Sequence, residues 1–257
     1  MTGLVRRSVA VVIPTYNEAE NIGRVLESTF ETFSSSKIDG WVIVVDDNSP
    51  DGTADIAGSL KERHDKIIVI KRPKKLGLGS AYRDGITLAL EKLNVEYVAE
   101  MDADGSHPPE RLPFMLDFLI KSGADCVVAS RYVEGGGWGW ESSIRTLVSR
   151  GANLLARLAT GIKLKDMTSG YRLYRADALN RIKLDRLDPG YVFQVQIIYE
   201  LVKKGFRVVE YPFVFMPRLG GKSKLGKAEF WRFFKWCIKT LMVRLFRTDM
   251  GINVITK

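Results

Sequence analysis

The feature that most constrains the fold of this chain is an alternation of short β-branched runs with segments of helical periodicity over its first half. The β-branched runs are interpreted as strands and cover residues 9–13, 41–46, 67–71, 97–102 and 126–130. Helices are expected between them, beginning near Glu18, Gly52, Gly79 and Pro108. This alternation is typical of a parallel sheet covered by helices. We therefore predict an α/β fold with a mainly parallel central sheet.

Clusters of unusual polar residues follow four of the predicted strands. In the one-letter code they read PTYNE, DDNSPDGT, DADGS and SRY. Ligands of open parallel sheets bind in a crevice beyond the carboxyl ends of the strands. We therefore expect the four clusters to meet in one crevice.

Three of these clusters contain acids that suggest particular chemistry. Asp102 and Asp104 lie two positions apart, and carboxylates so close repel each other unless a cation lies between them. Hard oxygen ligands select Mg²⁺ or Mn²⁺, which commonly bind one or two carboxylates together with substrate phosphates. The alternative is a solvated turn, because two aspartates separated by one residue are common by chance.

Asp46 is expected to accept hydrogen bonds from a base or ribose. Tyr16 and Glu18 suit a nucleobase, although Glu18 could equally stabilise the first turn of a helix.

The charge balance favours anionic partners. Lysine and arginine total 39 against 30 acids, giving a net charge of +9 and a pI near 9.5. Nucleic acid, anionic lipid and phosphorylated substrates all fit this charge.

Cys126 and Cys237 lack metal-ligand spacing and are interpreted as buried reduced thiols, which indicates a cytosolic compartment. No run reaches the roughly 18 apolar residues of a spanning helix, so any membrane association is expected to be peripheral.

The C-terminal part has a different pattern. Residues 218–227 are glycine-rich and basic, which predicts a mobile loop. Residues 228–247 predict one amphipathic helix, with Trp236 among its basic residues. Its apolar face holds Phe230, Trp231, Phe234, Cys237, Ile238, Leu241, Met242 and Leu245. Such a helix can lie in a headgroup layer or pack onto the sheet, and we expect the membrane contact.

Nine motifs carry a more specific signal. In chain order over residues 14–225 they read PTYNE, VVDDNSPDGT, KLGLGSAYRDG, MDADGSHPPE, SRY, SRGAN, TSGYRLY, GYVFQ and GKSKL. Together they resemble the dolichol-phosphate (polyprenyl-phosphate) mannose synthases, inverting enzymes of glycosyltransferase family two. The resemblance implies a Rossmann-like glycosyltransferase A-type fold that moves mannose from GDP-mannose to dolichyl or polyprenyl monophosphate. It assigns residues 1–227 to the catalytic domain and residues 228–257 to the amphipathic helix and tail.

The resemblance also implies roles for individual residues. The nucleotide sugar would be bound by Pro14, Tyr16, Glu18, Val44, Asp46, Asp102, Ala103, Asp104, Ser106, Arg131, Arg218 and Lys224. Mg²⁺ or Mn²⁺ would be held by Asp102, Asp104 and Ser106, and the lipid phosphate by Arg131, Arg145 and Ser149. The catalytic residues would be Asp104, Arg218 and Lys224. Guanidinium groups match phosphate oxygens geometrically, and a lysine adds a point charge.

Two positions depart from the family pattern. Ser106 stands where many relatives carry glutamine, and Gln196 stands where relatives often carry an acid. The loss of that acid matters little, because a lipid phosphate is already anionic and needs no general base. The expected mechanism is in-line attack of the phosphate oxygen on the anomeric carbon. The metal and Lys224 or Arg218 would stabilise the departing diphosphate.

Three other functions remain open from the sequence. One is the transfer of glucose from a UDP donor to the same lipid. Another is a basic nucleic-acid-binding module, which the acids at the strand ends disfavour because they repel a polyanion. The third is a silent scaffold that recruits a membrane partner. Under the favoured reading, the enzyme works peripherally at the cytoplasmic face of a membrane, without nucleic acid and with small membrane-anchoring subunits as further partners.

Overall fold

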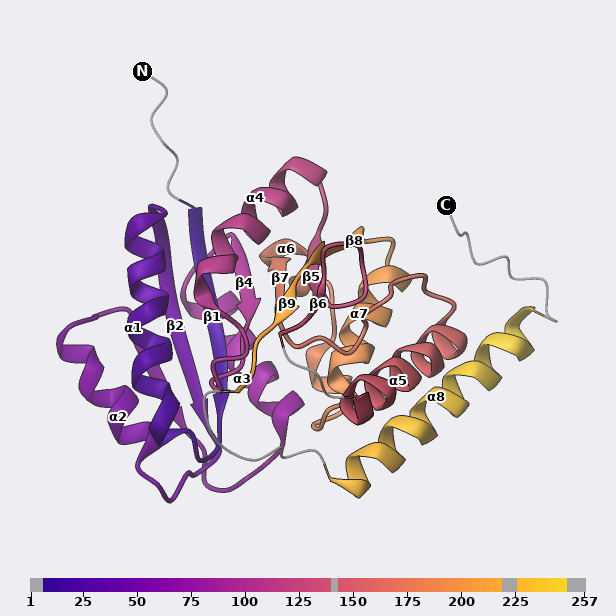
Figure 1. The fold of residues 1–257 in the computed structure, drawn as a ribbon, viewed down its shortest axis with the longest axis horizontal. Coiled ribbons are helices and arrows are strands. Elements are labelled where there is room, and N and C mark those ends of the chain that lie inside the picture. Colours follow the sequence, from indigo (N-terminus) through magenta and orange to yellow (C-terminus); the bar gives the residue numbers. More distant parts are fainter. Residues whose placement is uncertain (1–6, 140–142, 219–225, 249–257) are drawn as a thin grey trace.

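A seven-stranded sheet forms the centre of the computed structural model, which describes residues 7–139, 143–218 and 226–248 (Figure 1). The strand order is β3-β2-β1-β4-β7-β5-β8. The strands are β1 (Arg7–Thr15), β2 (Ile38–Asp46), β3 (Ile67–Lys71), β4 (Tyr97–Glu100), β5 (Cys126–Ser130), β7 (Arg172–Arg175) and β8 (Val208–Pro212). Neighbouring strands are parallel except where β7 pairs with β4 and β5. Short strands β6 (Gly137–Trp138) and β9 (Val214–Phe215) form a second parallel pair.

Helices cover both faces of the central sheet. One face carries α1 (Ala19–Ser35), α2 (Thr53–Ser59) and α4 (Leu112–Ser122). The other carries α3 (Leu78–Lys92), α6 (Ala176–Asn180) and α7 (Phe193–Lys203). The described residues also form the short 3₁₀ helices η1 (Leu60–Glu62), η2 (Pro109–Arg111) and η3 (Leu184–Arg186). Together with the mainly parallel sheet, these layers confirm the predicted α/β class.

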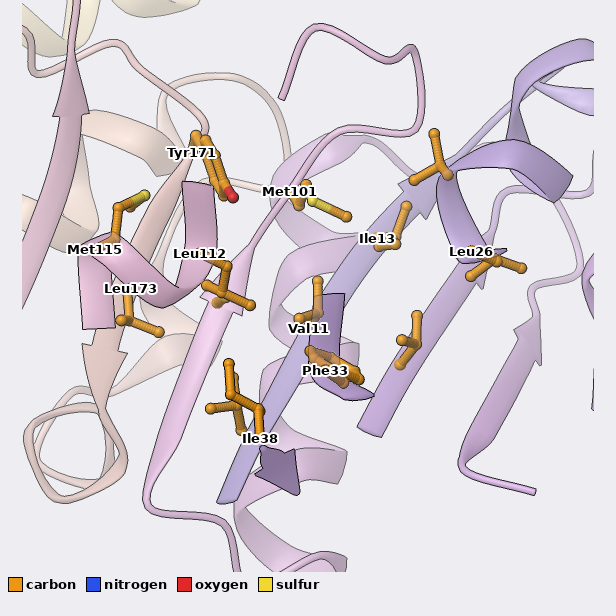
Figure 2. Packing of buried hydrophobic residues seen from close by; sticks show 14 of the residues in the cluster. Val11, Ile13, Leu26, Phe33, Ile38, Met101, Leu112, Met115, Tyr171 and Leu173 are labelled. Atoms are coloured by element: carbon orange, nitrogen blue, oxygen red, sulfur yellow. The ribbon is translucent and has the colours of Figure 1, made fainter. Parts of the chain in front are cut away.

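Strand β1 supplies side chains to both hydrophobic cores because successive residues of a strand point to opposite faces. Val11 and Ile13 belong to the core under α1 and α4, whereas Val12 belongs to the core under α3. Figure 2 shows Val11 and Ile13 among side chains from α1 and α4. On the other face, α3 lies so close that a Cβ on Gly85 would come within 2.3 Å of Val12 Cγ1. Burial on both faces explains why β1 reads as a continuous apolar run.

The strand predictions were accurate in the first half and incomplete in the second. Strands β3 and β5 have the predicted bounds, and β1, β2 and β4 differ from prediction only at their ends. Strand β7 was missed, although it is the strand that breaks the parallel order of the sheet. Its first residue, Arg172, is fully buried. A charged residue at a core position hides the apolar pattern by which a central strand is recognised.

Helix α8 (Lys227–Thr248) runs beside α5 (Ser143–Thr160), as Figure 1 shows. It packs inward through its half-buried Phe233 and Trp236 and its buried Cys237. The burial of Cys237 and Cys126 confirms the predicted buried thiols, whereas Trp236, predicted among the basic residues, packs against the core. The Trp236 ring instead meets Tyr199 of α7 edge-on, at 5.9 Å between centroids. No helix in the described ranges has the length and apolarity to cross a bilayer.

Candidate active site

A cavity lies beyond the carboxyl ends of β1, β2 and β4. Three of the four predicted polar clusters contribute to its wall, and the SRY cluster after β5 does not. The lining residues come from these strand ends, the start of α3, the turn before α7, the segment after β9 and the start of α8. They are Pro14, Thr15, Tyr16, Glu18, Asp47, Lys75, Gly77, Leu78, Ala81, Asp102, Ala103, Asp104, Gly190, Tyr191, Arg218 and Glu229.

Asp102 is held at the cavity wall by two buried neighbours. The Tyr82 hydroxyl donates a hydrogen bond to Asp102 Oδ1 at 3.1 Å. The Asp102 backbone N–H donates to His107 Nδ1 at 2.9 Å. Burial lowers the pKa of His107, which agrees with a neutral ring that accepts at Nδ1. The carboxylate of Asp102 is one-third exposed, so it remains available to a ligand.

Asp104 is more deeply buried and already has a cationic partner. Its Oδ2 lies 2.8 Å from Arg218 Nε, and its Oδ1 accepts hydrogen bonds from the backbone and the hydroxyl of Ser106 at 3.0 and 2.5 Å. Burial alone would raise the pKa of Asp104, but the charge of Arg218 and the hydrogen bonds from Ser106 hold it below its usual range. The group is therefore a carboxylate at neutral pH.

The acidic end of the cavity has the chemistry of a partial metal site. Two carboxylates converge there, and one of them already binds a positive group in the form of Arg218. Within the described residues, no group of three or more His, Cys, Asp or Glu side chains could complete a protein-only site. Mg²⁺ and Mn²⁺ commonly complete such a shell with substrate phosphates and water. The two aspartates thus fit a divalent ion that arrives together with a diphosphate.

The opposite end of the cavity has the character of a nucleoside site. Pro14 and Thr15 end β1, and the ring of Tyr16 follows them, with Lys75 Nζ 4.2 Å from its centroid. Glu18 is 7% exposed and accepts a hydrogen bond from Asn21 Nδ2 at 3.0 Å. An aromatic face beside a lysine and a buried acid can stack a base and bind its polar edge.

Comparison with known proteins identifies the family. Residues 10–183 match the model described as glycosyl transferase family 2. A polyprenol monophosphomannose synthase of Mycolicibacterium smegmatis is 40% identical over 84% of this chain and 80% of its own length. An undecaprenyl-phosphate mannosyltransferase of Micrococcus luteus is 41% identical over 85% of this chain and 87% of its own. The chain belongs to glycosyltransferase family 2.

Solved structures confirm the glycosyltransferase A-type fold. The glucosyl-3-phosphoglycerate synthase of Mycobacterium tuberculosis, solved with Mn²⁺, UDP and phosphoglyceric acid, superposes with a TM-score of 0.66. The match covers 93% of this chain and 78% of that one at 19% identity. At this identity the likeness concerns the fold alone.

Seven of the predicted site residues line the cavity of this family 2 glycosyltransferase. They are Pro14, Tyr16, Glu18, Asp102, Ala103, Asp104 and Arg218. Lys224 lies outside the described residues. Arg145 and Ser149 lie on α5 and do not line the cavity, and Ser149 Oγ has no hydrogen-bond partner in the described structure. Binding of the lipid phosphate by Arg145 and Ser149 stays a prediction.

Two predicted nucleotide contacts have other positions. Asp46 is 1% exposed and does not line the cavity. Its carboxylate accepts hydrogen bonds from the backbone of Ser49 at 2.8 Å and the hydroxyl of Thr15 at 2.9 Å, so it shapes the turn after β2. The neighbouring acid Asp47, and not Asp46, lines the cavity. Val44 is fully buried inside β2 and packs in the core.

Ser106 and Arg131 also differ from their predicted roles. Ser106 is fully buried, does not line the cavity, and donates its hydroxyl to Asp104 Oδ1, which it helps to orient. Metal binding by Ser106 stays a prediction. The Arg131 guanidinium donates to both carboxylate oxygens of Asp166, at 2.7 and 2.6 Å. Only 9% of its side chain is exposed, so its fork is engaged within the protein instead of being open to phosphate.

Several lining residues were not predicted. Lys75 Nζ lies over the ring of Tyr16, and Asp47 follows Asp46 directly in the sequence. Tyr191 lies in the GYVFQ motif, which was noted without assigning this residue a role. Glu229 is a lone acid at the start of a basic helix, and that contrast in charge was the available signal. Gln196 lies outside the cavity, where its Oε1 accepts the backbone N–H of Asp188 at 2.6 Å.

A buried carboxyl lies beneath the acidic end. Glu100, the last residue of β4, is fully buried and accepts a hydrogen bond from the Tyr174 hydroxyl at 3.0 Å. Burial raises its pKa to about 7, although the nearby charge of Arg172 lowers it. Arg172 donates to the backbone carbonyls of Gln194 and Met167 at 2.6 and 2.8 Å. This network fixes the end of the strand that carries Asp102.

Proposed function

We propose that this glycosyltransferase moves mannose from GDP-mannose to the phosphate of a dolichyl or polyprenyl lipid and releases GDP. The observation that carries the proposal is a single cavity with Asp102, Asp104 and Arg218 at one end and Tyr16 with Lys75 at the other. That arrangement suits a nucleoside joined to a diphosphate. The names of both curated relatives state mannose transfer to a polyprenyl or undecaprenyl phosphate, which supports the acceptor and the sugar.

Asp102 and Asp104 would hold the divalent ion, Mg²⁺ or Mn²⁺. When bound, such an ion neutralises charge that develops on a leaving diphosphate. Arg218 lies 2.8 Å from Asp104 and carries a fixed positive charge, so it is placed to bind the same phosphates once its carboxylate partner has another cation. We assign a similar role to Lys224 from the family resemblance.

The acceptor requires no protein base. A lipid phosphate is anionic at neutral pH and can attack the anomeric carbon directly. The enzyme then acts by holding donor and acceptor in line and by stabilising the departing charge. Arg145 and the hydroxyl of Ser149, both on α5, are proposed to hold the lipid phosphate.

A lipid bilayer is the proposed partner of the outer faces of α5 and α8. Apolar side chains on both helices are exposed in the described structure: Leu147, Leu154 and Leu158 on α5, and Phe230, Trp231, Phe234, Ile238, Met242 and Leu245 on α8. The exposed basic residues Lys235 and Lys239 flank the α8 stripe and complement anionic headgroups. We propose peripheral association at the cytoplasmic face, with small anchoring subunits as further partners. The division of the chain at residue 227 also stays a prediction.

A direct assay tests the function. The purified protein is mixed with a polyprenyl phosphate in vesicles, Mn²⁺ and either radiolabelled GDP-mannose or radiolabelled UDP-glucose. The expected result is organic-extractable label from GDP-mannose alone, lost when EDTA is added and restored by excess Mn²⁺. Label from UDP-glucose instead would reassign the donor. Transfer that is insensitive to EDTA would remove the metal from the proposal.

A further inference from the structure

Helix α8 begins at the donor cavity, although most of the helix runs beside α5 (Figure 1). Glu229, in its first turn, lines the cavity next to Gly190 and Tyr191. The side chain of Glu229 is 17% exposed. The helix with an exposed apolar outer face is therefore also a wall of the donor site.

The carboxylate of Glu229 joins α8 to the turn that precedes α7. Its Oε2 accepts the backbone N–H of Tyr191 at 3.0 Å. Its Oε1 accepts from Arg232 Nη2 at 2.5 Å, and Arg232 Nη1 lies 3.9 Å from Asp188 Oδ1. A Cβ on Gly190 would come within 2.3 Å of Glu229 Oε2, so the carboxylate occupies the space that a side chain there would need. The start of α8 and residues 188–191 thus form one packed unit.

The same turn is fixed on its other side to the nucleoside end of the cavity. The backbone N–H of Ser80 in α3 donates to the carbonyl of Pro189 at 2.9 Å. A Cβ on Gly77 would come within 2.5 Å of that carbonyl oxygen. The Gly77 N–H in turn donates to Asp47 at 3.2 Å. A continuous set of contacts therefore runs from Glu229 through the turn to the wall beside the nucleoside site.

We propose that Glu229 is a positioning residue that couples the seating of α8 on a lipid surface to the affinity of the cavity for the nucleoside diphosphate. The proposal rests on the function proposed above. Trp231, Ile238 and Leu245 on the outer face of α8 are 58%, 42% and 50% exposed. Burying this face in lipid favours the helical, docked state of α8, because apolar surface leaves water. That state is the one in which Glu229 meets Tyr191.

Thermodynamic linkage fixes what the coupling must do. If lipid binding favours the state that binds nucleotide, nucleotide binding must strengthen lipid binding by the same factor. We expect vesicles to lower the Kd for GDP by about fivefold, at the lower end of typical coupling between sites.

The test measures the Kd for GDP by calorimetry in the presence of Mn²⁺, with and without vesicles that contain anionic phospholipid. Glu229→Ala should bind GDP with the same Kd in both conditions, because it cannot accept the Tyr191 N–H. Glu229→Gln keeps an acceptor oxygen and should retain most of the vesicle effect. Asp117→Ala, which removes an exposed partner of Lys121 on α4, is the matched control and should behave as wild type.

Vesicle flotation of each variant, with and without GDP, separates the possible failures. A wild-type protein that floats and binds GDP with an unchanged Kd overturns the coupling, as does a full vesicle effect in Glu229→Ala. Equal flotation with and without GDP also counts against it. A protein that binds no GDP, or does not float, instead overturns the donor or the membrane part of the proposed function and the coupling with it.

Discussion

Two aspartate–arginine pairs place a buried acid in the cavity wall and differ in the exposure of the arginine. Asp47 and Asp104 are almost equally buried, at 5% and 4% exposure. The partner of Asp47 is Arg72, at 2.7 Å, whose side chain is 3% exposed. The partner of Asp104 is Arg218, at 2.8 Å, whose side chain is 26% exposed. The two acids are almost equally buried, whereas the two arginine side chains differ in exposure.

This difference separates a structural ion pair from an exchangeable one. Arg72 also donates to Ser80 Oγ at 2.8 Å and lies 3.3 Å from Asp84, so leaving Asp47 would strand a buried charge. The side chain of Arg218 is 26% exposed, and we propose that it moves from Asp104 toward a bound phosphate. We therefore propose that the wall beside Asp47 is organised before the ligand arrives, whereas Asp104 exchanges Arg218 for a metal ion when the nucleotide sugar binds.

The largest expected effect is on catalysis at the diphosphate end. Asp104→Ala should reduce the rate of mannose transfer by about a thousandfold, or about 4 kcal/mol. The reason is that Asp104 is proposed to hold the metal ion that neutralises the leaving diphosphate. Initial rates with labelled GDP-mannose measure the loss, and circular dichroism checks the fold. Asp55→Ala, at a surface ion pair with Lys71, is the matched control and should retain normal transfer. Full turnover by Asp104→Ala would remove Asp104 from the mechanism.

At the nucleoside end the corresponding change should affect stability. Asp47→Ala leaves Arg72 buried without its closest partner and should lower the free energy of unfolding by about 3 kcal/mol. Urea unfolding followed by tryptophan fluorescence gives the value. Asp84→Ala removes the more exposed partner of the same arginine and should cost less than about 1 kcal/mol. Equal losses of stability in Asp47→Ala and Asp84→Ala would show that the burial of the acid does not determine its contribution to the pairing with Arg72.

The same contrast explains what the sequence could and could not predict. β-branched runs placed β3 and β5 at their observed bounds, because the apolar pattern of a strand is local. The choice between Asp46 and Asp47 was not local: they are adjacent at a strand end, and the backbone there decides which one reaches the cavity. The sequence predicted a nucleoside contact through Asp46, whereas the acid that reaches the cavity wall is Asp47.

Long-range partners account for the remaining differences. Arg131 was predicted to bind phosphate because a free guanidinium suits it, but Asp166, far along the chain, engages both sides of the fork. Glu229 reached the cavity through the path of α8, which no spacing in the sequence records. Asp102, Asp104 and Arg218 do line one cavity, and their roles toward metal and diphosphate stay predictions.

A smaller effect concerns pH, through Glu100 beneath the diphosphate end. Burial raises its pKa to about 7 from a usual value of 4.5, so the folded protein binds this proton more tightly than the unfolded chain. The stabilisation that comes from protonated Glu100 is complete below the pKa of this group in the unfolded chain. It is lost as the pH rises through the pKa of Glu100 in the folded protein. Metal-free protein should therefore lose about 2 kcal/mol of stability through this group between about pH 5 and about pH 8. Urea unfolding at each pH measures the loss, and Glu100→Gln should flatten the profile. An unchanged profile would assign the pH dependence to other groups.

The smallest expected effect tests the cation exchange itself. Arg218→Ala removes the group that competes with a metal for Asp104, so nucleotide-free protein should bind Mn²⁺ about tenfold more tightly, a gain of about 1.4 kcal/mol. Mannose transfer should nevertheless fall, because the same guanidinium is proposed to stabilise the leaving diphosphate. Electron paramagnetic resonance titration of free Mn²⁺ measures the affinity independently of turnover. Arg63→Ala, at an exposed pair with Glu27, controls for the loss of one positive charge. If Arg218→Ala and Arg63→Ala bind Mn²⁺ equally, Arg218 does not compete with the metal for Asp104. The Asp104–Arg218 pair would then be a structural ion pair, as Asp47–Arg72 is.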